Sequence, residues 1–128
     1  MSSKGRRANA LINEYVELTE GANDCGINFQ EQMRIKDIRA ELQALAGDGK
    51  PLWDHDDSPF VNGPGWELIV RWATGGMDGD RWYKELYQAR AALALLAHGE
   101  VSDRGMSADL SPEGAQFSSR AWIERSKG

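Results

Sequence analysis

Residues 78–99, DGDRWYKELYQARAALALLAHG, form the longest strongly periodic stretch of the chain. Apolar side chains recur there at steps of four, three, four and three, which places them along one stripe of an α-helix. These residues are Trp82, Leu86, Ala89, Leu93 and Leu96. Asp78 or Asp80 can cap the start of such a helix, and Gly99 can close it in the left-handed conformation. The pattern predicts a helix over residues 79–98.

The second half of that stretch, AALALLA at residues 91–97, contains no polar side chain. A helix that is apolar on every side must be covered on every side. The segment therefore predicts one of two arrangements. It is either the centre of a helical bundle or half of a homodimer interface formed through residues 91–97.

Two earlier segments also have helical periodicity. Leu11, Tyr15 and Leu18 share one face of a helix expected over residues 7–20. A second helix is expected over residues 28–46, where Asn28 is followed three residues later by Glu31, a loose match to a capping box. Its apolar stripe is Ile35, Ile38, Leu42 and Leu45, and Phe29 and Met33 are expected to widen that stripe near its start.

Three other regions are less regular. Residues 47–65 contain three prolines and form a long irregular connection, expected to be pinned by Leu52, Trp53, Phe60 and Val61. Residues 66–73, WELIVRWA, fit both a strand and a helix. We favour the helix because no other segment offers an obvious partner strand. Ser111 and Pro112 open a short C-terminal helix through Trp122.

The predicted fold class is therefore all-α. Four to five helices would form a small bundle around the central helix at 79–98. A chain of 128 residues corresponds to a single domain, 1–128, with residues 1–6 and 124–128 expected to be mobile. One cysteine, Cys25, excludes an intrachain disulfide and any cysteine-rich zinc site. There is no secretory or membrane-spanning stretch, so a cytoplasmic location is expected.

Charge is distributed unevenly along the chain. The net charge is −5, yet residues 1–8 carry +3 and residues 114–128 carry +2, which leaves −10 for the residues between them. Such a surface repels nucleic-acid phosphate, so direct nucleic-acid binding is not expected, and it favours basic partners. The carboxylates expected to form the binding surface are Glu14, Glu17, Glu20, Asp54, Asp56 and Asp57. The alternative is that the excess charge only keeps the protein in solution.

Candidate chemistry is sparse. Asp54, His55, Asp56 and Asp57 have the side chains of a metal site, although a solvated acidic loop is the simpler explanation of them. His98 would complement the negative end of the central helix. Residues 74–80 form a glycine-rich loop, but they lack the lysine of a phosphate-binding motif and place two aspartates at the helix entrance. No catalytic residue and no cofactor are predicted.

Five tryptophans are many for this length, and Trp66 and Trp72 are candidates for an exposed aromatic patch. The leading hypothesis is a small acidic protein-interaction module without catalytic activity. It would be regulatory or inhibitory and would bind a protein with a basic surface, such as one that handles nucleic acid. The alternative is a metal-binding domain or metal-dependent enzyme that uses residues 54–57.

Overall fold

The structure, a computed structural model, describes residues 3–25, 28–47, 52, 64–71, 81–110 and 119–127. Within these ranges the fold is α+β, so the predicted all-α bundle is wrong. The helices are α1 (Ser3–Cys25), α2 (Phe29–Gly47) and α3 (Leu86–Leu96), with a 3-10 turn, η1 (Asp103–Gly105). The strands are β1 (Pro64–Arg71), β2 (Arg81–Tyr83), β3 (Ser107–Asp109) and β4 (Arg120–Lys127), and they form an antiparallel sheet in the order β2-β1-β4-β3.

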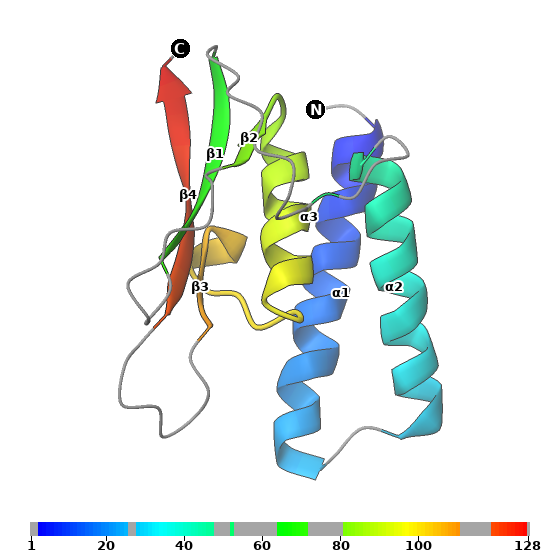
Figure 1. Ribbon diagram of the computed structural model, residues 1–128. Helices are drawn as coiled ribbons and strands as arrows, with labels where there is room; N and C mark the ends of the chain where they lie inside the picture. The colour runs from blue at the N-terminus through cyan, green and yellow to red at the C-terminus, as the bar shows by residue number, and fades with distance from the viewer. Residues whose placement is uncertain are drawn as a thin grey trace.

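The described elements form three layers (Figure 1). The sheet is one outer layer, the α1–α2 hairpin is the other, and α3 lies between them. This position explains why the second half of α3 is apolar on every side. Ala91, Ala92, Leu93 and Ala94 are fully buried within one chain. The expectation that this segment is covered on all sides is confirmed for residues 91–94 and Ala97, with a sheet as part of the cover, whereas Leu95 and Leu96 are only partly buried.

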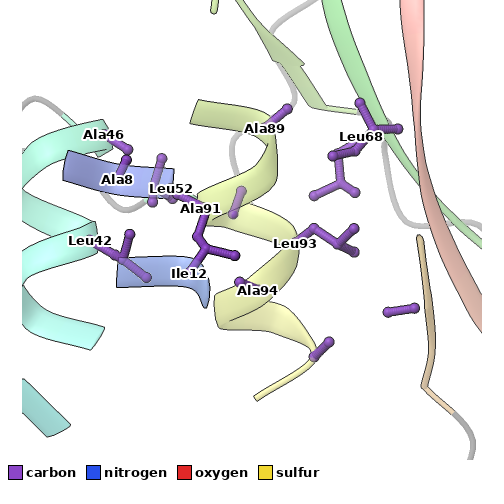
Figure 2. Close-up of a cluster of buried hydrophobic side chains, with 14 of the residues drawn as sticks. Ala8, Ile12, Leu42, Ala46, Leu52, Leu68, Ala89, Ala91, Leu93 and Ala94 are labelled. Atoms are coloured by element: carbon purple, nitrogen blue, oxygen red, sulfur yellow. The ribbon is translucent and has the colours of Figure 1, made fainter. Parts of the chain in front are cut away.

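The two sides of α3 carry side chains of different size. Leu93 points toward Leu68 of β1, whereas the side that carries Ala91 faces Ile12 and Leu42 of the hairpin (Figure 2). The distance between packed helices depends on the side chains at the contact, so small alanines let the hairpin approach α3 closely. Burial of residues 91–94 inside the monomer accounts for the apolar segment without a second copy of the chain.

The predicted helix at 79–98 begins too early. Arg81, Trp82 and Tyr83 form β2, which pairs with β1 through Leu68, Glu67 and Trp66 respectively. The helix begins at Leu86, where Gln88 Oε1 accepts a hydrogen bond from the Glu85 N–H, as the third residue of a capping box does. Its end was predicted correctly. Gly99 has φ +85°, and its N–H donates to the Ala94 carbonyl at 2.8 Å.

The segment at 66–73 is a strand over its described part, and the preference for a helix is wrong. Leu68 and Val70 alternate inward as fully buried side chains. The missing partner is β4, which pairs with the whole length of β1 from Pro64–Lys127 to Arg71–Arg120. The C-terminal helix predicted through Trp122 is therefore also wrong over residues 120–122, while residues 111–118 lie outside the described residues. Residues 124–127 belong to β4 and residues 3–6 to α1, where mobile ends were expected.

The α1–α2 hairpin has a defined register. Arg7 pairs with Glu41, and Glu14 pairs with Arg34, so the partners are seven residues apart on both helices. Seven residues are about two helical turns, which places both pairs on one side of the hairpin. Both helices are correctly located. α1 is longer than predicted, whereas α2 is shifted by one residue. Asn28 caps α2 by accepting the Glu31 N–H at 2.8 Å.

One described residue shows how the long connection is attached. Leu52 is buried, its N–H donates to Gln43 Oε1 of α2, and its carbonyl accepts a hydrogen bond from the Tyr83 hydroxyl of β2. Burial raises the pKa of Tyr83. This confirms the expected role of Leu52, whereas Trp53, Phe60 and Val61 lie outside the described residues.

Candidate interaction surface

The hairpin extends past the end of α3 (Figure 1). We call residues 17–25 of α1 together with residues 29–34 of α2 the outer end of the hairpin. None of its described side chains is fully buried. In the remainder of the hairpin the opposite holds, because Leu11, Ile12 and Tyr15 of α1 and Ile38 and Leu42 of α2 are all at most 1% exposed.

The boundary between the two parts lies where α3 stops. Arg39 of α2 donates hydrogen bonds to the Tyr15 hydroxyl and to the Leu95 carbonyl, and so ties α1, α2 and the last turn of α3 together. Gly99 lies just after the end of α3, and a Cβ at this position would lie 2.0 Å from Cδ1 of Tyr15. Both contacts fix the point beyond which α3 no longer covers the hairpin.

Phe29 and Met33 are the exposed large apolar side chains among the described residues, at 74% and 46% exposure. The sequence analysis placed them on the core stripe of α2, which is wrong. Met33 lies five residues before Ile38, and five residues turn a helix by about 500°, so the two side chains point about 140° apart. Both large side chains therefore lie on the outward side of α2.

Glu14, one of the predicted binding residues, forms an ion pair within the hairpin. Its carboxylate accepts two hydrogen bonds from Arg34, at 2.5 Å from Nε and 2.7 Å from Nη2. The Arg34 hydrogen bond holds the pKa of Glu14 below its ordinary value, against a smaller opposing effect of burial. Glu14 therefore joins the two helices of the hairpin.

Glu17 and Glu20 are exposed, and neither has an ion pair within the described ranges. The hairpin register places Glu17 at the level of Glu31 and Glu20 at the level of Asn28. Both carboxylates are therefore at the same end of the hairpin as Phe29. The structure therefore places these two predicted residues at the same end of the hairpin as an aromatic side chain that was expected to widen the apolar stripe of α2.

Of the other predicted residues only Trp66 is described, and it does not join this surface. Trp66 is partly buried on β1 and packs against the core. Trp72 and the whole of Asp54, His55, Asp56 and Asp57 lie outside the described residues. The structure therefore does not test the alternative of a metal site at residues 54–57.

Two further observations concern chemistry. In the part of the chain that the structure describes, histidine, cysteine, aspartate and glutamate side chains nowhere gather in a group of three that could hold a metal ion. His98 is exposed at the end of α3 with φ +53°. No described helix combines the length and apolarity needed to cross a membrane.

Comparisons with protein-family models, with curated proteins and with solved structures gave no significant match. The functional argument therefore rests on the geometry of the described residues.

Proposed function

We propose that this chain is a protein-interaction module that binds its partner through the outer end of the α1–α2 hairpin. The observation that carries the proposal is the 74% exposure of Phe29 at the start of α2. Burying a large exposed aromatic side chain against a partner removes apolar area from water, which favours binding. Aromatic side chains anchored in pockets contribute much of the binding energy of protein interfaces.

The partner we expect has an apolar pocket for Phe29 and Met33 surrounded by basic side chains. Glu17 and Glu20 are exposed at this end, while Arg34 is neutralised by Glu14. The carboxylates would attract a basic surface from a distance, and the aromatic ring would supply affinity once in contact. A regulatory or inhibitory role in the cytoplasm, acting on a nucleic-acid-handling protein, is the form of this function that the net charge favours.

The test compares four forms of the chain as bait in its source cell, with quantitative mass spectrometry of the bound proteins. The forms are the wild type, Phe29→Ala, Glu17→Lys/Glu20→Lys, and the control Ala44→Ser, an exposed position of α2 far from the outer end. We expect one basic protein to be lost with Phe29→Ala and with the charge reversal, and retained by the control.

The purified partner then gives the quantitative result. Phe29→Ala should weaken binding by about 30-fold, as loss of an anchor worth about 2 kcal/mol does. The charge reversal should mainly slow association and remove its dependence on salt. If every bound protein is retained by all four forms, or if the captured protein is a second copy of this chain, the proposal is wrong.

A further inference from the structure

A second feature lies on the opposite side of α1 from α2. A cavity of about 360 Å³ is formed by α1, by Arg90 of α3 and by the segment that contains η1. Ile12, Val16 and Val101 give it an apolar wall, and Arg90 and Arg104 contribute two guanidinium groups. It shares Glu17 with the interaction surface proposed above, but neither Phe29 nor Met33 lines it.

Neither arginine has a carboxylate partner among the described residues. Arg90 donates from Nη1 to the neutral Asn9 Oδ1, while its Nε is buried without a hydrogen-bond partner. Burial lowers the pKa of Arg90. The Arg90 guanidinium is partly buried and has no carboxylate beside it, and an oxyanion is the ligand that its planar donors fit.

The covering segment has an unusual backbone. Asp103, Arg104 and Gly105 have φ values of +50°, +59° and +82°, and two of these residues are not glycine. Consecutive left-handed residues with side chains are strained, and such strain concentrates at binding sites. The conformation also brings Gly105 onto the Arg90 guanidinium, since a Cβ there would lie 3.0 Å from Nε and Nη2. Arg104 is exposed at the edge of the same cavity.

We propose that this cavity binds a small organic acid. Its carboxylate or phosphate group would lie between Arg90 and Arg104, and its carbon skeleton would contact Ile12, Val16 and Val101. Glu17 also lines the cavity and would repel an anionic group. The ligand would therefore be small and would keep its charged group on the side of the two arginines. A guanidinium pair above an apolar wall recognises an oxyanion joined to a hydrocarbon, rather than a free cation or a neutral molecule.

The probes are benzoate, phenyl phosphate and the neutral benzamide, titrated into the whole chain and followed by backbone amide shifts in NMR spectra. We expect saturable shifts at Val101, Arg104 and Gly105 with the two anions, at a Kd of about 1 mM or tighter for ligands of this size. Comparing the two anions shows which headgroup the site prefers. Benzamide should give no saturable shift.

Variants separate this site from general attraction by positive charge. Arg104→Gln should weaken anion binding about tenfold, because one charge-assisted hydrogen bond is removed. Arg6→Gln, an exposed position of α1 outside the cavity, makes the same change in net charge and should have no effect. Glu17→Gln should tighten binding by about two- to threefold, because a neighbouring negative charge is removed.

Three results would overturn the proposal. The first is that neither anion gives saturable shifts at these residues when its concentration reaches about 10-fold above the expected Kd. The second is equal weakening by Arg6→Gln and Arg104→Gln. The third is weaker anion binding after Glu17→Gln. None of these measurements involves Phe29 or a protein partner, so the two proposals can fail separately.

Discussion

The two ends of the α1–α2 hairpin have different sequences and different surroundings. Where α3 lies against it, the hairpin buries its apolar residues completely, and Arg39 and Gly99 mark the limit of that contact. Beyond the limit, the same two helices continue without a fully buried side chain and expose Phe29. Phe29 and Met33 point away from the side of α2 that carries Ile38 and Leu42, so they are exposed even though both residues are apolar.

The largest effect is expected at the covered end. Leu42→Ala removes a fully buried side chain that packs in the core beside Ile12 and α3, so it should lower the free energy of unfolding by about 2–5 kcal/mol. Urea unfolding followed by circular dichroism measures this value. A loss below about 1 kcal/mol would mean that the covered end is no better packed than the outer end.

The next effect is expected at the limit itself. Gly99→Ala introduces a Cβ that would overlap the Tyr15 ring at a position with φ +85°, so we expect a loss of about 1–3 kcal/mol by the same measurement. The control is His98→Gly, which replaces an exposed left-handed residue and should not destabilise the fold. Equal effects of the two substitutions would contradict the close contact between Gly99 and Tyr15.

Sequence patterns located the three helices because their signals are local. The caps at Asn28 and Gly99 and the core positions Leu11, Ile38 and Leu42 follow from spacing alone. The sheet was missed because its pairing is not local. The alternation of Leu68 and Val70 is compatible with a strand as well as with a helix. The partner strand β4 follows more than 40 residues later, after Pro112, which was interpreted as the start of a helix. In β2, Trp82 happens to continue the helical stripe of α3, so the capping pair of Glu85 and Gln88 was the better signal for where the helix begins.

The candidate surface was only half visible from the sequence. Glu17 and Glu20 were recognised as exposed acids, whereas pairing of Glu14 with Arg34 depends on the hairpin register, which no local pattern gives. Phe29 and Met33 could have been recognised, because neither lies in phase with Ile38 and Leu42. The cavity at Arg90 and Arg104 could not, since its walls come from α1, α3 and the η1 segment.

A smaller effect is expected where the outer end meets the rest of the hairpin. The folded-state pKa of Glu14 is lowered by Arg34, so the pair contributes stability above the ordinary glutamate pKa and loses it as the pH falls through the lowered value. The difference in unfolding free energy between the wild type and Arg34→Gln should therefore be present at neutral pH and shrink in acid. Because both side chains are about 39% exposed, the difference should be smaller than either core effect. A difference that grows in acid would contradict the assignment.

The smallest effect on stability is expected at Phe29, and that small effect is what separates a binding residue from a core residue. Phe29→Ser exchanges a side chain that is 74% exposed, at the first residue of α2, so little apolar area returns to water on unfolding. We expect the free energy of unfolding to change by no more than about 0.5 kcal/mol in urea unfolding. A loss close to that of Leu42→Ala would show that Phe29 is covered within the chain in solution, and the outer end would then be an extension of the core. An unchanged stability, combined with loss of the partner in the binding experiment, would show that Phe29 acts in recognition and not in folding.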